Sequence, residues 1–176
     1  MFVVVFSHMW IIIVFTLVLV GSLAYAAASG APWVPTWKRD LNRIERLLDL
    51  KDGERFVELG SGNGRVCRYL AKSTDADITG VELSFLQHGV SIFQNRISRS
   101  KARSVFGNVF NHDLGSYDAV YLFLMPETYK KIQPKFEREL KPGSRVVSYV
   151  WPIPGWSAEK IDEVEGSSKL FLYIKK

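Results

Sequence analysis

The spacing of hydrophobic residues changes several times along this chain, and each change predicts a different element. Residues 2–28 contain no Asp, Glu, Lys or Arg, and Met9 to Val20 is almost continuously Ile, Val, Leu, Phe and Trp. A helix of about 20 apolar residues crosses a bilayer. The pattern therefore predicts an N-terminal transmembrane helix over residues 1–29, followed by a folded domain over residues 30–176.

A cleavable signal peptide is the main alternative for this segment, since AYAAASGA offers small residues of the cleavage type. However, no Lys or Arg precedes the apolar run, and the run is longer than that of a usual signal peptide. All of the charged residues follow it, beginning with Lys38 and Arg39. The positive-inside rule then predicts a single-pass membrane protein whose domain lies on the cytoplasmic side.

Short apolar runs alternate with helically spaced ones along the rest of the chain, which predicts parallel strands joined by helices. The predicted elements are a helix at 37–50, a strand reaching 58, a helix beginning near 65, a strand at 77–83, a helix at 85–100, strands at 103–106 and 119–124, a helix at 127–140 and a strand at 145–150. Two alternating runs, 160–165 and 169–175, are joined by Gly166-Ser167-Ser168 and predict an antiparallel hairpin. We expect an α/β fold with a mostly parallel sheet.

The most informative stretch is RFVELGSGNGRVCRYLA, residues 55–71. A short apolar run reaches Glu58, and glycines follow at every second position, at Gly60, Gly62 and Gly64, before helical spacing begins. Glycine is needed where the chain turns with positive φ, and where a side chain would keep a ligand away from the backbone. The stretch predicts a buried strand, a tight glycine turn and the start of a helix.

The acidic residues around this turn indicate the ligand. The pattern is E-x-G-x-G-x-G rather than the G-x-G-x-x-G of dinucleotide folds, and Glu58 suits a cationic amine better than a pyrophosphate. Glu82 ends the next predicted strand, where an acid can accept the hydroxyls of a ribose. An amine and a ribose together describe S-adenosylmethionine. The alternative is an ordinary glycine-rich turn without a ligand, in which case the positions of the two acids would be a coincidence.

The loop after the third strand, Gly107-Asn108-Val109, is expected to meet the adenine ring of that cofactor. Asn108 can pair with the exocyclic amine while the Val109 N–H meets a ring nitrogen; alternatively, Asn108 is only a turn residue. The expected cofactor-binding residues are Glu58, Gly60, Ser61, Gly62, Gly64, Glu82, Asn108 and Val109.

Composition narrows the class of protein. The 176 residues carry a formal net charge of +5, which suits a membrane-facing surface. Nucleic-acid binding would call for a dense basic run with interleaved aromatics, and the sequence has none. We also expect no metal ion. Cys67 is the single cysteine, so no disulfide framework exists. Without a nearby histidine in the sequence, Cys67 is expected in the core rather than as a nucleophile.

The predicted arrangement, with VELGSGNGR, VELS, GNVF and FLMPE in these positions, resembles the Rossmann-like class I S-adenosylmethionine-dependent methyltransferases. An apolar anchor, a WVPT segment before the first helix and WPIPGW after the fifth strand make it similar to the small membrane-anchored protein-lysine methyltransferases, whose mitochondrial members modify the ADP/ATP carrier and the ATP synthase c-subunit. The resemblance implies methyl transfer to a lysine side chain of a protein. Two features depart from common methyltransferase patterns: Asn108 replaces an acid, and FLMPE stands where base and amide N-methyltransferases have N-P-P-Y.

Such an enzyme must bind a lysine amine without its proton. A lysine with a pKa near 10.4 is about 99.9% protonated at neutral pH, and apolar walls would lower that pKa. Aromatic faces can also hold a methylated ammonium. The candidate walls of this substrate channel are Phe123, Met125, Pro126 and Trp151, with Trp156 as a further aromatic. Glu127 could take the proton or simply stabilise a helix N-terminus, so no general base is assigned.

The sequence is compatible with three functions. The first is a membrane-anchored protein-lysine methyltransferase. The second is a methyltransferase that acts on a small molecule or lipid at the membrane. A long insertion that encloses a small substrate would favour this function, and the sequence has no segment long enough to form one. The third is a non-enzymatic protein that kept the cofactor fold. Trp33 and Trp37 in the linker could lie in the membrane interface, cover the cofactor or pack in the domain.

Overall fold

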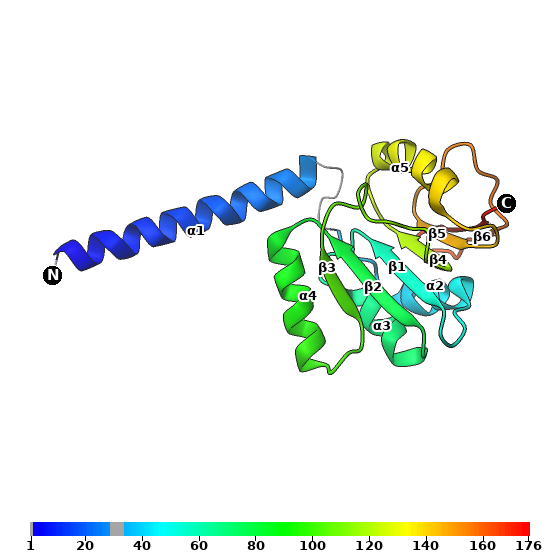
Figure 1. Cartoon of the computed structure of the whole chain (residues 1–176), viewed down its shortest axis with the longest axis horizontal. Coiled ribbons are helices and arrows are strands. Elements are labelled where there is room, and N and C mark those ends of the chain that lie inside the picture. Colours follow the sequence, from blue (N-terminus) through cyan, green and yellow to red (C-terminus); the bar gives the residue numbers. More distant parts are fainter. Residues whose placement is uncertain (1, 29–33) are drawn as a thin grey trace.

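The computed structural model describes residues 2–28 and 34–176 (Figure 1). Trp33 lies outside these residues. The elements are α1 (Phe2–Ala28), the short 3-10 helix η1 (Lys38–Asp40), α2 (Leu41–Leu48), β1 (Arg55–Leu59), α3 (Arg65–Ser73), β2 (Asp77–Glu82), α4 (Phe85–Ile97), β3 (Arg103–Phe106), β4 (Ala119–Leu122), α5 (Pro126–Glu139), β5 (Arg145–Tyr149), β6 (Lys160–Asp162) and β7 (Leu170–Ile174).

The seven strands form one sheet in the order β3-β2-β1-β4-β5-β7-β6. Strands β1 to β5 run parallel, with Glu58 of β1 opposite Gly80 of β2 and Tyr121 of β4. Only β7 and β6 run antiparallel to their neighbours. The predicted α/β fold, mostly parallel with a C-terminal antiparallel hairpin, is therefore confirmed. The chain order reverses between β1 and β4, and ligands of open α/β sheets bind at such a point.

Some predicted boundaries shift. The helix expected at 37–50 is divided into η1 and α2, and β4 ends at Leu122 rather than at residue 124. Because β4 ends early, the two residues after it leave the sheet and belong to the loop before α5. In the hairpin, the second strand, β7, pairs with β5, and the first strand, β6, forms the edge.

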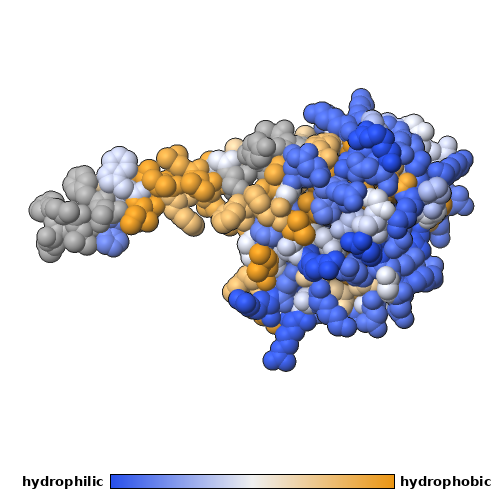
Figure 2. Space-filling view, viewed as in Figure 1, coloured by the Kyte–Doolittle hydropathy of each residue, from blue (hydrophilic) through white to orange (hydrophobic). Residues whose placement is uncertain are grey.

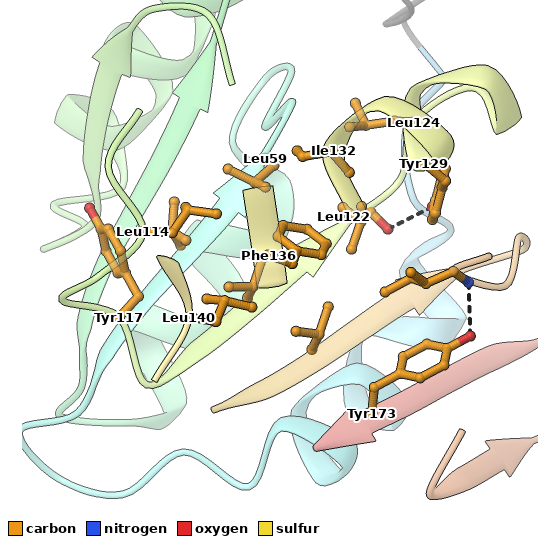
Figure 3. Close-up of a cluster of buried hydrophobic side chains, with 14 of the residues drawn as sticks. Leu59, Leu114, Tyr117, Leu122, Leu124, Tyr129, Ile132, Phe136, Leu140 and Tyr173 are labelled. Carbon is orange, nitrogen blue, oxygen red and sulfur yellow. Dashed lines mark hydrogen bonds between the residues drawn. The ribbon is translucent and has the colours of Figure 1, made fainter. Parts of the chain in front are cut away.

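Alternation along the central strands divides the core between the two faces of the sheet. Val57 and Val120 belong to a cluster with α5, whereas Phe56 and Tyr121 belong to a cluster with α2 and α3. Figure 3 shows the α5 cluster, where the Tyr129 hydroxyl donates to the carbonyl of Leu122 at 3.2 Å. The same hydroxyl lies 3.3 Å from the carbonyl of Tyr149. The carboxyl ends of β4 and β5, where the site lies, are thereby held together.

A buried ion-pair network fastens α2 to the edge of the sheet. Arg43 is 4% exposed, and its side chain donates to the carboxylates of Asp40, at 2.8 Å, and of Asp162 in β6. Asp40 also accepts from the Tyr149 hydroxyl at 2.6 Å. Buried charges are stable only when they are paired and hydrogen-bonded in this way.

Helix α1 extends away from the domain on the side where α4 lies (Figure 1). Its large apolar side chains between Met9 and Val20 are exposed, except that of Leu19, which is half-buried. In the part of the chain that the structure describes, no helix is long and apolar enough to cross a membrane. The predicted transmembrane helix is therefore not supported by the structure.

Candidate methyl-donor site

The glycine turn between β1 and α3 has the backbone that the sequence predicts. Gly60, Gly62 and Gly64 have φ values of +76°, +52° and +71°, a region that residues with a side chain rarely adopt. The N–H groups of Gly60 and Ser61 both donate to the Val81 carbonyl, at 2.9 and 3.0 Å. The turn is thus held against the end of β2.

Glu82 lies where β2 ends and contacts the same turn. One carboxylate oxygen accepts from the N–H of Gly62 at 2.7 Å, and the other accepts from the N–H of Ser84 at 2.7 Å. Burial raises the pKa of this carboxyl, and backbone hydrogen bonds from Ser84, Gly62 and Leu83 oppose that rise. A carboxylate has about four lone-pair sites, so Glu82 can still accept from a ribose hydroxyl.

Glu58 is buried behind the turn, at 5% exposure. Its carboxylate lies 3.3 Å from the backbone N and 3.1 Å from the Sγ of Cys67. Burial raises the pKa of Glu58 to about 8, and the nearby charge of Glu82 adds to the effect. A cationic group beside Glu58 would reverse this shift by stabilising the carboxylate.

Cys67 belongs to the core, as expected. Its side chain is 2% exposed, and burial together with the neighbouring Glu58 raises the pKa of the thiol well above its ordinary value. Since the thiolate is the nucleophilic form, a thiol held protonated in this way is inert. The structure gives Cys67 the role of a donor to Glu58.

Ser61 offers a further polar group in the same place. Its hydroxyl is buried and has no hydrogen-bond partner among the described residues, a state that proteins rarely leave uncompensated. A Cβ added at Gly80 would lie 2.8 Å from both Cβ and Oγ of Ser61 and 2.9 Å from Sγ of Cys67. Gly80 therefore makes room for the turn, and the free hydroxyl fits a polar ligand such as S-adenosylmethionine.

Asn108 follows β3 in the same region. The N–H of Gly107 donates to the carbonyl of Glu82 at 3.0 Å, which places this loop beside the turn. The Asn108 side chain accepts from the N–H of Phe110 at 3.0 Å, so it stabilises a turn. Val109 packs against the core. Adenine recognition by Asn108 and Val109 stays a prediction.

The loops after β4 and β5 enclose a cavity of about 270 Å³. It is lined by Val34, Phe123, Leu124, Met125, Pro126, Val150 and Trp151. The structure thus brings together all four channel residues named from the sequence. None of the lining residues is ionisable. Leu124 also reaches the glycine turn, since a Cβ on Gly60 would lie 2.6 Å from its Cδ2.

Two aromatic and acidic candidates lie elsewhere. The prediction that Trp156 lines the channel is wrong, because its ring packs on Phe136 and Tyr173, with centroids 6.0 and 5.9 Å away. Its indole N–H donates to Glu137 at 2.6 Å. Glu127 is exposed in the first turn of α5 and is not among the residues that line the cavity.

Several residues of the site were missed in the sequence. Thr36 donates or accepts a 2.9 Å hydrogen bond with the Tyr121 hydroxyl, and its carbonyl accepts from Arg65 at 2.8 Å. The linker is therefore fixed across the strand ends, beside the turn, and Val34 joins the cavity wall. Val150 has φ +71°, a strained conformation for a β-branched residue that is typical of functional sites. The WVPT segment was the only sequence indication of this contact.

The comparison with protein families decides which family this chain belongs to. The family model described as "ANTKMT methyltransferase domain" matches residues 58–160, more than half of the chain. This protein belongs to that family. The match includes Glu58, Glu82 and the channel residues 123–126 and 151. The prediction of an S-adenosylmethionine-dependent methyltransferase is confirmed.

Several proteins similar to this chain carry lysine methyltransferase names. A protein-lysine N-methyltransferase of Saccharolobus islandicus (strain REY15A) is 29% identical over 149 residues, covering 81% of this chain and 92% of the relative. The human lysine N-methyltransferase named for the ATP synthase c-subunit is 24% identical over 144 residues; the match covers 81% of this chain and 60% of the human protein. The resemblance stated from the sequence is confirmed.

A solved structure supports the fold independently. The RNA methyltransferase from Salinibacter ruber, determined with S-adenosyl-L-homocysteine, superimposes with a TM-score of 0.77 over 80% of this chain and 93% of its own, at 24% identity. At that identity the likeness concerns the fold alone. The same fold thus occurs in a methyltransferase with a bound product of the cofactor.

Proposed function

We propose that this protein transfers a methyl group from S-adenosylmethionine to the ε-amine of a lysine side chain in a protein. The observation that carries the proposal is the apolar cavity that meets the glycine turn. Leu124 lines the cavity and also contacts the turn at Gly60. A side chain that enters the cavity therefore approaches the place where the cofactor is expected.

The residues of the site are assigned to the cofactor as follows. Glu58 faces the amine of the methionine portion, Ser61 offers its unpartnered hydroxyl, and Glu82 accepts the ribose hydroxyls. Asn108 and Val109 bind the adenine. When bound, the cofactor supplies a methyl group already activated by a sulfonium. The chain's own task is to place a neutral amine in line with that methyl at close range.

The cavity walls can keep the amine neutral. Seven apolar or aromatic residues line the space and none carries a charge, so entering it as an ammonium is unfavourable. The lysine accordingly releases its proton to water before it enters. The Phe123 ring is fixed edge-on against Tyr149 at a centroid distance of 4.7 Å, and Trp151 is 42% exposed at the entrance. These faces can hold the methylated ammonium by cation–π contact.

A protein substrate is favoured by the names of the relatives and by the shape of the site. The archaeal relative is named a protein-lysine N-methyltransferase, and the human relative is named for the ATP synthase c-subunit. In the described chain, short segments bound the cavity: the linker at Val34 and the loops after β4 and β5. A lysine side chain of a folded protein can reach into such an entrance.

We further propose that the protein works at a membrane, with its methyltransferase domain on the cytoplasmic side. Two observations support this location. The apolar side chains of α1 are exposed over most of the helix between Met9 and Val20. Every Asp, Glu, Lys and Arg of the chain follows that stretch. Fractionation of cells that produce the protein, with protease added to intact and opened membranes, tests both parts.

The test of the activity is transfer of a radiolabelled methyl group from the cofactor to membrane proteins by the full-length chain. Labelled lysine in a digested protein band is expected, and label confined to the lipid fraction would favour a small-molecule substrate instead. Trp151→Ala should lower kcat/KM for the protein substrate by about tenfold, the loss of one aromatic face, and leave cofactor affinity unchanged. Trp37→Ala is the matched control, because Trp37 is 60% exposed and outside the cavity.

A further inference from the structure

Helix α4 packs on the sheet through polar residues and exposes large apolar residues to the outside. The residues that it buries are Gln87 and Ser91, at 8% and 2% exposure. The residues that it presents outward include Ile92, Phe93 and Ile97, at 48%, 63% and 67% exposure. A surface helix of a globular protein normally buries its apolar stripe and exposes its polar face.

Hydrogen bonds fix α4 in this orientation. The Asn95 amide donates to the Ala102 carbonyl at 2.9 Å, and Gln94 accepts from Arg68 of α3. At its start, the Ser84 side chain accepts from the N–H of Gln87. A rotation that buried the apolar face would break the contacts of Asn95 and Gln94 and leave these half-buried polar groups unpaired, which is costly. The outward apolar face is therefore a stable feature of the fold.

Helix α1 leaves the domain from the same face. A cavity of about 310 Å³ separates the two helices, and only apolar residues line it: Phe15, Val18 and Leu19 from α1, with Phe85, Leu86, Gly89, Val90 and Phe93 from α4. Figure 1 shows α1 projecting beside α4, and Figure 2 shows hydrophobic residues continuing from α1 onto the adjoining edge of the domain. The two helices thus form one continuous apolar surface, the α1–α4 surface.

A basic pocket borders this surface. It has a volume of about 480 Å³ and lies between α3 and α4, where Gln94 of α4 and Ser98, the residue that caps its end, form one wall. The remaining lining residues are Lys38, Asn63, Arg65, Arg68, Tyr69 and Lys72. Four of these are basic, and none of the described lining residues is acidic. An apolar surface with a basic border matches the acyl chains and the anionic headgroups of a bilayer.

We propose that the α1–α4 surface binds an anionic lipid bilayer, with α4 lying in the plane of the interface. Ile92, Phe93 and Ile97 enter the boundary between headgroups and acyl chains, and the basic pocket takes lipid phosphates. A second copy of this chain fits the surface less well, because a two-fold contact would bring two basic borders close together. The proposal does not depend on the substrate of the methyl transfer.

A fluorescent reporter on the full-length chain tests this contact separately from α1. Ile92→Cys is labelled with an environment-sensitive dye; Cys67 is 2% exposed and does not compete for the label while the protein is folded. The control is Ile161→Cys, since Ile161 is 54% exposed on β6, at the opposite edge of the sheet. Vesicles of phosphatidylcholine with phosphatidylglycerol should blue-shift and brighten the label at 92 but not at 161.

Three outcomes would overturn the proposal. The label at 92 could remain in water while the protein sediments with the vesicles, which would assign binding to α1 alone. It could respond to protein concentration without vesicles, which would identify a second copy as the occupant. The label could also respond neither to vesicles nor to protein concentration, which would favour a different protein as the partner of this surface. A label that shifts with anionic vesicles, and less at high salt, supports the proposal.

Affinity measurements on surface variants give a second readout. Phe93→Gln combined with Ile97→Gln should weaken vesicle binding about tenfold or more, because two exposed apolar side chains leave the interface. Lys72→Glu should weaken binding only to vesicles that contain phosphatidylglycerol. Both variants should bind S-adenosyl-L-homocysteine like the wild type, which shows that they are folded. Unchanged vesicle affinity of the double variant would contradict the role of α4.

Discussion

Replacing Glu58 with glutamine should remove most of the proton release that accompanies cofactor binding at pH 7. The buried Glu58 carboxyl has a pKa of about 8, so about 90% of the molecules hold this proton at pH 7. A cationic amine placed beside the carboxylate lowers its pKa by several units. Binding should therefore release about 0.9 proton from Glu58, and a glutamine has no such proton to lose.

Titration calorimetry with S-adenosyl-L-homocysteine in two buffers of different ionisation enthalpy measures this release. The ligand's own amine is already mostly protonated at pH 7, so it adds little to the difference between the two proteins. Glu127→Gln is the matched control, since Glu127 is an exposed acid outside the cavity, and it should behave like the wild type. Equal proton release from wild type and Glu58→Gln would refute the assignment of Glu58 to the cofactor amine.

The same pKa shift predicts how the stability of the ligand-free protein depends on pH. Because the folded-state pKa lies above the ordinary value of 4.5, the folded protein binds more protons than the unfolded chain between these two values. The contribution of Glu58 to the unfolding free energy therefore falls as pH rises through this window, by at most about 1.4 kcal/mol per pH unit. Urea denaturation at several pH values should show this slope in the wild type and a reduced slope in Glu58→Gln.

Two stability predictions follow from other contacts. Gly60→Ala should destabilise the protein more than Gly53→Ala does. Both positions have positive φ, which costs about 1–2 kcal/mol for residues other than glycine. Only at Gly60 would the new Cβ also clash with Leu124, at 2.6 Å. Equal losses in denaturant would contradict the contact. Arg43→Met should cost about 3–5 kcal/mol, since it strands two carboxylates in a buried network. Lys51→Met, at an exposed ion pair, should change the unfolding free energy by less than about 1 kcal/mol.

The sequence predicted the sheet well because its local patterns agreed with the final packing. Val57 and Val120 stand in short apolar runs, and both lie in strands buried on the two faces, as such runs predict. The predicted end of a strand was wrong where the apolar run in the sequence continues beyond the strand. Phe123 and Leu124 extend the run of β4, yet they leave the sheet to line the cavity. No periodicity distinguishes a buried strand end from an apolar cavity wall.

Residues of the candidate site could be named from the sequence where their relation is local, and they were missed where it depends on distant contacts. Glu58 and Gly62 belong to one short motif, and their spacing fixes their relation. Thr36 and Tyr121 are 85 residues apart, and only the fold shows that their hydroxyls meet. Trp156 was misassigned for the same reason, because its aromatic neighbours come from α5 and β7.

The hydrogen bonds of the glycine turn have a consequence for selectivity among the nucleotides of a cell. The N–H groups of Gly60 and Ser61 are taken by the Val81 carbonyl, and that of Gly62 by the Glu82 carboxylate. A phosphate chain needs such donors free, and here it would meet an acid instead. Adenosine triphosphate and nicotinamide dinucleotides share the adenosine portion, yet they should be repelled at this turn, so that even at high abundance they do not compete with the methyl donor.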